Sequence, residues 1–199
     1  KEVRFDAIRG NISEIKTLAS LCGTQEKNSG NMAVSDTMDV EKITDKSDHC
    51  GKITGIDGSG RGVDADNADT VTEENLAQHI SNAKMLSKKL QTIVAITGAI
   101  DLVTDGSSCY VIRNGNPQMG HVTGAGCQLS GILTAFLAAN PENKLQAAAA
   151  AVCMMGYAGE LAAEKSGQSG SGTYRVSLMD AVSCMDGDIL ERGARYEIR

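Results

Sequence analysis

The 199-residue sequence contains no tryptophan, and only 3% of its residues are aromatic. Its core must therefore be built from aliphatic side chains and alanine. Two prolines against 22 glycines indicate many tight turns and close backbone contacts, and argue against a stiff, extended chain. The length is enough for one ordinary globular core and too short to argue for two full domains.

Long apolar runs and basic clusters are also missing. The longest apolar run, residues 147–155, is mostly alanine and too short to cross a membrane. The net charge is −6 and the Lys and Arg residues are scattered, so no basic stripe is present to neutralise a nucleic-acid backbone. We therefore predict no membrane and no nucleic-acid partner.

The six cysteines never form a C-x-x-C pair. This spacing argues against a disulfide scaffold and against a zinc knuckle. No signal peptide precedes Lys1, so we expect a cytoplasmic, reduced protein. The chain has no initiator methionine and opens directly on "KEVRFDAIRGN". We expect it to be a piece of something longer.

Hydrophobic spacing predicts strands and helices in alternation. A short strand over residues 5–10 is followed by a helix over residues 12–21, which Asn11 can cap. A second helix is predicted to begin at a Thr72 cap. The all-apolar run "TIVAITG" after it is typical of a strand covered on both faces. A helix followed by such a strand indicates an α/β protein with parallel pairing.

The remaining segments complete this pattern. Two strand-like runs flank Asp105-Gly106, a hairpin signal, and a long alanine-rich helix is predicted to be mostly buried. "GQSGSGTYRVSLMDAVSCM" predicts a glycine loop, a short extended piece and a final helix. Residues 22–60 show no sustained period and predict a surface insertion, flexible at least in part.

The strongest local signal for a site is "HVTGAGCQLSGIL", residues 121–133. A turn with Gly124 and Gly126 lets backbone N–H groups point inward, and the helix that begins there adds its positive end. Together they form a cradle for a phosphate or a developing oxyanion. The alternative is a plain turn, with Cys127 as a small helix-starting residue, because short glycine motifs often occur without a ligand.

Two further stretches follow predicted strands. In "RGNISE", Arg9 ends a strand, where α/β proteins place ligand-binding groups. Asn11 and Glu14 share a helix face, and their oxygens suit a hydrated Mg²⁺; a simple capping box is the alternative and is favoured by base rates. In "TGAID", the Thr97 hydroxyl could reach a nucleotide, or the stretch is only a strand-ending turn.

Taken together, "RGNISE", "GVDA", "IVAITGAIDLVTDG", "NGNPQMGHVTGAGCQLSGI" and "GSGTYRVSLMDAV" resemble hydroxyethylthiazole kinase, a family of the ribokinase-like superfamily. The resemblance implies one partial kinase domain over residues 1–199, with a mostly parallel central sheet flanked by helices and the family's N-terminal part missing. It also implies a homotrimer. The implied activity is transfer of the ATP γ-phosphate to the hydroxyl of 5-(2-hydroxyethyl)-4-methylthiazole, with Mg²⁺, in thiamine salvage.

The resemblance assigns roles at the nucleotide end. Arg9 and Thr97 fall where the family contacts ATP, and Asn11 belongs to the same cofactor-binding stretch. Glu14 falls at the magnesium-linked acid of the "N-x-x-E" motif.

It also assigns roles at the acceptor end. Gly124 falls at the position that binds the thiazole and forms the anion hole, and Cys127 stands where related sugar and pyrimidine kinases carry an aspartate base. Cys127 is therefore the expected catalytic residue. One departure is Ala99, which stands where many relatives have an acidic residue.

Two other functions stay open. One is a different ribokinase-like small-molecule kinase or an ATP-dependent hydrate dehydratase, against which the cysteine after "GAG" argues. The other is a catalytically silent, assembly-forming paralogue, which the expected truncation and insertion favour somewhat.

Overall fold

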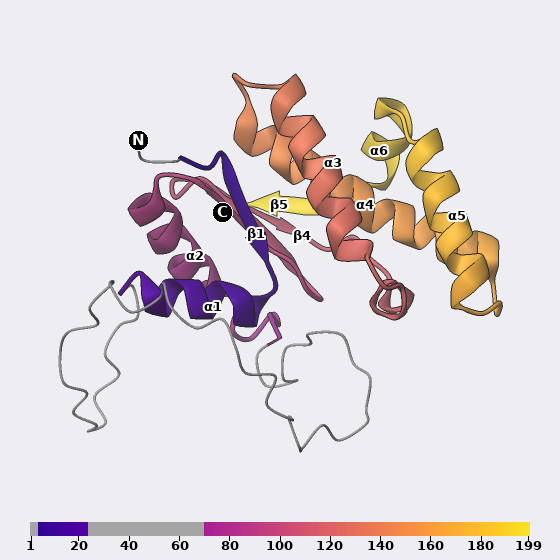
Figure 1. Ribbon diagram of the computed structural model, residues 1–199, viewed down its shortest axis with the longest axis horizontal. Helices are drawn as coiled ribbons and strands as arrows, with labels where there is room; N and C mark the ends of the chain where they lie inside the picture. Colours follow the sequence, from indigo (N-terminus) through magenta and orange to yellow (C-terminus); the bar gives the residue numbers. More distant parts are fainter. Residues whose placement is uncertain (1–3, 24–69) are drawn as a thin grey trace, which may run out of the picture. The chain divides into compact units, whose positions relative to one another are not determined.

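The computed structural model describes residues 4–23 and 70–199 (Figure 1). Apart from Cys22 and Gly23, the insertion predicted at residues 22–60 lies outside the described residues. The described elements, in chain order, are β1 Ala7–Gly10, α1 Ile12–Leu21, α2 Leu76–Leu90, β2 Ile93–Ile96, β3 Asp101–Thr104, β4 Cys109–Ile112, the 3-10 helix η3 Pro117–His121, α3 Ala125–Ala139, α4 Lys144–Ser166, α5 Ser171–Cys184, α6 Gly187–Gly193 and β5 Tyr196–Ile198.

The described strands form one sheet in the order β1-β2-β3-β4-β5. β1 and β2 pair in parallel, whereas β2–β3, β3–β4 and β4–β5 pair antiparallel. The predicted α/β class is confirmed, but the described part of the sheet is mixed rather than mostly parallel. β3 and β4 are antiparallel because the turn around Gly106 (φ +92°) that joins them is a few residues long, and such a turn can join only antiparallel neighbours.

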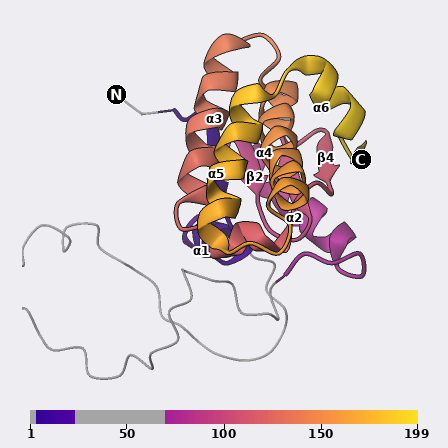
Figure 2. The same ribbon diagram turned by 90° about the vertical axis from the view of Figure 1, so that its right-hand side faces the viewer.

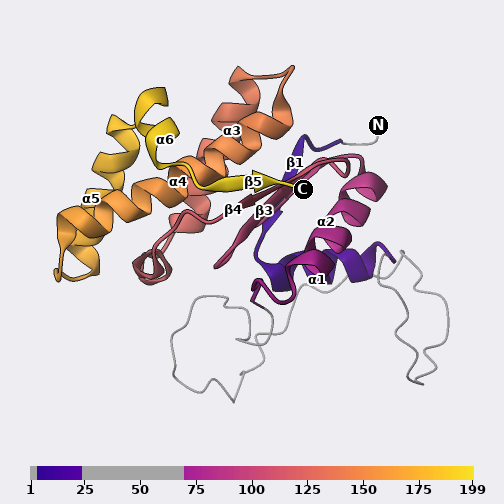
Figure 3. The same ribbon diagram turned by 180° about the vertical axis from the view of Figure 1, so that it is seen from behind.

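Helices cover both faces of the sheet, as Figures 1 and 3 show. On one face, buried sheet residues such as Ala95 and Val103 pack with residues of α3, α4 and α5. On the other face, Val94 and Leu102 pack with α1 and α2. Because neighbouring strand residues point to opposite faces, β2 must be apolar throughout, and all four of its residues are buried as predicted.

α4 is the central helix of the first face and packs against both α3 and α5 (Figure 2). Alanines and glycines on several sides let neighbours approach closely, and twelve of its 23 residues are buried. By length and composition alone α4 could cross a membrane, but 67% of its apolar window is buried inside the described structure. It is placed as a core helix.

α1 has the predicted bounds and the predicted Asn11 cap, with Ile12 and Ile15 buried. Leu21, the last residue of the helix, is 81% exposed. At the head of α2 the prediction was wrong. Asn75 rather than Thr72 precedes the helix, because the Asn75 side chain accepts a hydrogen bond from the Thr72 amide and closes a separate turn.

The C-terminal part also differs from the prediction. The stretch predicted as a short extended piece is helical, since α5 runs unbroken from Ser171 to Cys184. α6 and the edge strand β5 follow it and were not predicted. β5 has only three residues and is held by a distant partner: Arg199 and Cys109 exchange backbone hydrogen bonds of 2.8 and 2.9 Å.

Candidate active site

Arg9 lies near the carboxyl end of β1 and connects two of the predicted site segments. Its Nη2 donates a 2.9 Å hydrogen bond to Thr97 Oγ1. Its guanidinium also lies against Gly126, since a Cβ added there would stand 2.9 Å from Nη1 and 3.1 Å from Nη2. Gly126 therefore has a physical reason to lack a side chain.

The Arg9 guanidinium is not fully satisfied by its surroundings. Its Nε is buried and, within residues 4–23 and 70–199, has no hydrogen-bond acceptor. A buried unpaired donor costs about 1–3 kcal/mol, and such groups in native structures call for an explanation such as an absent ion or ligand. An anionic ligand beside Arg9 would supply the missing counter-charge.

The head of α3 has the geometry expected of an anion site. Gly124 precedes the helix with φ +89°, a left-handed conformation that favours glycine. A side chain added to Gly124 would meet no atom within 4 Å. In the part of the chain that the structure describes, the first-turn amides of Gly126 and Cys127 have no acceptor, as expected at a helix N-terminus. Gly124 and Cys127 are both exposed.

The turn between β2 and β3 is held by Asp101. Asp101 Oδ1 accepts a 2.7 Å hydrogen bond from the Gly98 amide, while the Thr97 amide donates to the Gly10 carbonyl at 3.0 Å. Burial raises the pKa of Asp101 to about 7, against the opposing effects of the Gly98 bond and the positive charge of Arg9. This carboxyl was not predicted as a site residue, although it ends the "TGAID" stretch that drew attention to Thr97.

Asn11 and Glu14 form the capping box. The Glu14 amide donates to Asn11 Oδ1 at 2.8 Å, and the Asn11 amide donates to Glu14 Oε2 at 2.7 Å. The capping box, which was the alternative to a ligand site for this pair, is therefore present. The cap also places the Glu14 carboxylate beside Gly10, at the end of β1, because a Cβ at Gly10 would lie 2.9 Å from Oε2.

The donor set decides what kind of metal the described residues can hold. Among them, no group of three or more His, Cys, Asp or Glu side chains is arranged to enclose an ion. Hydrated Mg²⁺ needs only one or two carboxylates when phosphates and waters complete its shell. Glu14, exposed at the carboxyl end of a strand, fits that mode of binding.

The topology explains why these segments meet. β1 and β2 run parallel and β3 returns antiparallel, so Gly10, Thr97 and Asp101 lie at one edge of the sheet. Arg9 joins this edge to the head of α3. The structure thus brings Arg9, Thr97 and Gly126 into contact and places Glu14 next to them in the chain. Within the described residues, no hydrogen bond joins Cys127 to Arg9.

A hollow of the described surface lies away from these residues. It measures about 190 Å³ and is lined by α4, α5 and α6 residues that include Leu161, Ala181 and Ile189. Its lining contains none of the predicted site residues, and its charged side chains Lys165 and Asp180 pair with each other at 2.8 Å. It lacks the converging donors that a phosphate needs.

Comparisons with known proteins agree on one family. The profile of the Hydroxyethylthiazole kinase family matches residues 33–188. The chain is 41% identical over 198 residues to "Hydroxyethylthiazole kinase" of Clostridium acetobutylicum, covering 99% of this chain and 60% of the relative. It is 33% identical over 206 residues to "Hydroxyethylthiazole kinase" of Desulfovibrio desulfuricans, covering 99% and 59%. The chain therefore spans about 60% of the length of these curated relatives.

A solved structure supports the same fold. The hydroxyethylthiazole kinase protein of Pyrococcus horikoshii superposes with a TM-score of 0.57 at 28% identity, covering 64% of this chain and 48% of that chain. The likeness supports the α/β fold.

Proposed function

Since this chain belongs to the hydroxyethylthiazole kinase family, we propose that it transfers the γ-phosphate of ATP to the hydroxyl of 5-(2-hydroxyethyl)-4-methylthiazole in thiamine salvage. One observation carries the proposal: the Arg9 guanidinium is held between Thr97 Oγ1 and Gly126, beside the unpaired amides that begin α3. A cation and a helix N-terminus thus meet at one sheet edge.

This arrangement suits phosphoryl transfer for a physical reason. The reaction requires in-line positioning and neutralisation of charge on the phosphate oxygens far more than covalent work by the protein. Guanidinium groups bind phosphate with charge-assisted hydrogen bonds, and free amides at a helix N-terminus bind anions. Arg9 and Thr97 would hold the nucleotide, and the amides after Gly124 would hold the transferring phosphoryl oxygens.

Cys127 is our proposed acceptor-side residue. Its thiol is exposed on the first turn of α3, next to the amides that would bind the phosphoryl group. From there it would accept the proton of the substrate hydroxyl or orient that hydroxyl for attack. Gly124, with open space where a side chain would be, would leave room for the thiazole alcohol.

Mg²⁺ is the expected cofactor, and when bound it neutralises charge on the triphosphate. Glu14 is the residue that would hold it. The hydrogen bond from the Asn11 amide to Glu14 Oε2 keeps the carboxylate oriented at the end of β1. Asn11 therefore serves this site through the cap.

We further propose a cytoplasmic homotrimer without a membrane or nucleic-acid partner. The acidic net charge of −6 and the burial of α4 in the core support the last two points. Exposed apolar side chains on α5, Val176 at 62% and Met179 at 50% exposure, offer contact area for assembly. Sedimentation equilibrium measures the oligomeric state, and a monomer at every concentration would exclude the trimer.

The test is an assay of ADP release with the 199-residue chain, ATP, Mg²⁺ and the thiazole alcohol. We expect turnover that depends on the alcohol and yields the phosphate ester in mass spectrometry. Binding of ATP without turnover would instead indicate a catalytically silent paralogue. Turnover only with a pyrimidine alcohol would indicate a different ribokinase-like kinase.

A further inference from the structure

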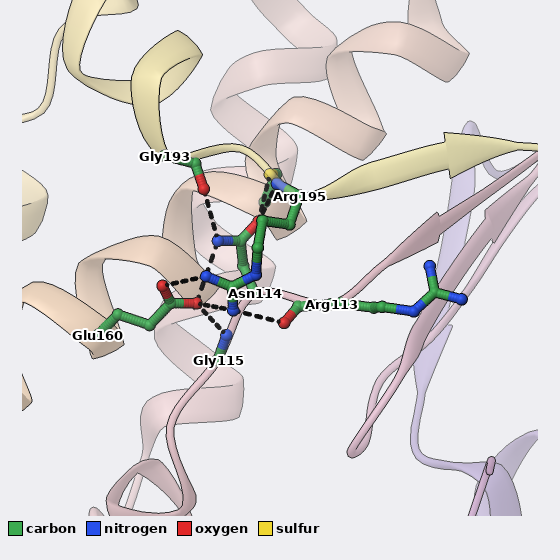
Figure 4. A network of polar contacts seen from close by, with 7 residues as sticks. Arg113, Asn114, Gly115, Glu160, Gly193 and Arg195 are labelled. Carbon is green, nitrogen blue, oxygen red and sulfur yellow. Dashed lines mark hydrogen bonds and ion pairs between the residues drawn. The ribbon is translucent and has the colours of Figure 1, made fainter. Parts of the chain in front are cut away.

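A partly buried polar network joins the end of β4 to α4 and to the C-terminal segment (Figure 4). At its centre is Asn114, only 4% exposed. Its Oδ1 accepts hydrogen bonds from the Arg195 amide at 2.7 Å and the Cys153 thiol at 3.0 Å. Its Nδ2 donates to Glu160 Oε1 at 3.0 Å and to the Gly193 carbonyl at 2.9 Å. All the hydrogen-bonding capacity of this amide is used, so its orientation is fixed.

Glu160 on α4 is the charged member of the network, with a side chain 16% exposed. Its Oε1 accepts a 2.8 Å hydrogen bond from the Gly115 amide, in addition to the bond from Asn114. The Arg195 guanidinium pairs with both carboxylate oxygens at 2.8 Å, the bidentate geometry that gives strong, directional contacts. One carboxylate thus fixes both the backbone that leaves β4 and the C-terminal segment.

The backbone that leaves β4 leads to the candidate active site. We name residues 114–124 the connector; it contains η3 and ends at the Gly124 turn. It is seated on α4 through two glycines. A Cβ at Gly156 would lie 2.6 Å from the Asn114 carbonyl oxygen, and one at Gly159 would collide with Met119. Gly156, Gly159 and Glu160 have i, i+3, i+4 spacing and so share one helix face.

We propose that Glu160 is a positioning residue for the kinase reaction: it anchors the start of the connector on α4 and so sets where Gly124 and Cys127 stand relative to Arg9. The Gly115 amide that it holds precedes Gly124 by only nine residues. If the anchored end moves, the short and partly helical segment between Gly115 and Gly124 therefore moves with it and displaces the Gly124 turn. Misplacing reacting groups by about 1 Å can cost on the order of a hundredfold in rate. The inference rests on the proposed function.

Three substitutions separate anchoring from general stabilisation. Glu160→Ala removes Oε1, which accepts from Asn114 and Gly115 of the connector, together with the carboxylate that pairs with Arg195. Glu160→Gln keeps one oxygen for the Gly115 amide, and Arg195→Met breaks the same ion pair but leaves Glu160 on the connector. Each variant is assayed at a temperature where circular dichroism shows it folded. We expect kcat to fall at least about tenfold in Glu160→Ala, with KM for ATP within about twofold, and to stay within about threefold in the other two.

Hydrogen–deuterium exchange gives a readout that does not need turnover. Amides of residues 122–128 should exchange about tenfold faster in Glu160→Ala than in Arg195→Met. A Glu160→Ala protein with the kcat and the exchange of Arg195→Met would overturn the proposal. If the unsubstituted chain does not turn over, the proposed function fails and exchange alone decides whether Glu160 fixes the head of α3.

A second pair covers the case in which Glu160→Ala does not fold. Gly156→Ala places a methyl group against the Asn114 carbonyl and must shift the connector. Gly131→Ala, on α3, adds the same methyl group where nothing lies within 4 Å. We expect lower kcat and faster exchange at residues 122–128 for the first and neither change for the second. Equal values for the two variants would contradict the proposal.

Discussion

Gly126→Ala tests the contact on which the proposed nucleotide site depends. The new Cβ would stand 2.9 Å from Arg9 Nη1, whereas ordinary contacts begin at 3.4 Å. The guanidinium must therefore move by about the difference, 3.4 − 2.9 = 0.5 Å. The 2.9 Å bond to Thr97 Oγ1 would then exceed the usual 3.2 Å limit if the movement is away from Thr97.

The expected magnitude follows from the nucleotide-binding role proposed for Arg9. A hydrogen bond to a charged group contributes about 1.5–3 kcal/mol, and each 1.4 kcal/mol is roughly tenfold in affinity. Displacing Arg9 from the phosphates should raise the KM for ATP roughly 10- to 100-fold. Stability should change little, because alanine is favoured over glycine inside a helix by about 1 kcal/mol, which offsets much of the lost Thr97 bond.

The assay is ADP release over a range of ATP concentrations, with a thermal melt of each variant. Gly131→Ala is the matched control, since it makes the same change in α3 in open space. It should keep the KM of the unsubstituted chain. If both variants have the same KM for ATP within twofold, the Arg9–Gly126 contact has no part in nucleotide binding.

Three more predictions concern single side chains. Burial raises the pKa of Asp101 from 3.8 to about 7. Between about pH 4 and 7 the folded chain therefore keeps a proton that the unfolded chain releases. Because of this difference, the free energy of unfolding should fall as pH rises through that range. Thermal melts of Asp101→Asn should show a smaller fall; an identical pH dependence would contradict this. Cys127→Ala should lower kcat and leave the KM for ATP nearly unchanged, and an unchanged kcat would remove the proton-acceptor role. Glu14→Gln keeps a capping-box side chain, so the melting temperature should not change. Because it removes the carboxylate charge, it should raise the Mg²⁺ concentration needed for half-maximal rate. An unaltered Mg²⁺ dependence would exclude Glu14 as a ligand.

Features with strong local signals were predictable from the sequence. α1 has its predicted bounds because Asn11 and Glu14 satisfy its first amides locally. The β3–β4 hairpin forms around Gly106, whose φ of +92° suits glycine. In both cases the residues that determine the structure lie within a few positions of it. The sequence placed Arg9 and Thr97 each at the end of a strand, where ligand groups gather, but it did not predict the hydrogen bond between them.

Features that depend on distant partners were missed. β5 is an exposed edge strand of three residues, and only its pairing with β4 makes it a strand. Glu160 lies within an alanine-rich helix, where nothing in the local pattern distinguishes it from a solvent-facing charge. Its partners are Gly115 and Arg195, respectively 45 and 35 positions away. Asp101 became notable only once its burial was known.

The pair Asn11 and Glu14 shows that a helix cap and a ligand site need not exclude each other. The cap uses Glu14 Oε2 as an acceptor for the Asn11 amide, and in the described parts of the chain no partner occupies Oε1. A carboxylate has two oxygens and several lone pairs, so one oxygen can hold the backbone while the other faces a cation. The cap also fixes the rotamer in advance, which lowers the entropy cost of ordering the side chain on binding. A capping box at the end of a strand is therefore compatible with the magnesium hypothesis and favours it energetically over an unrestrained glutamate.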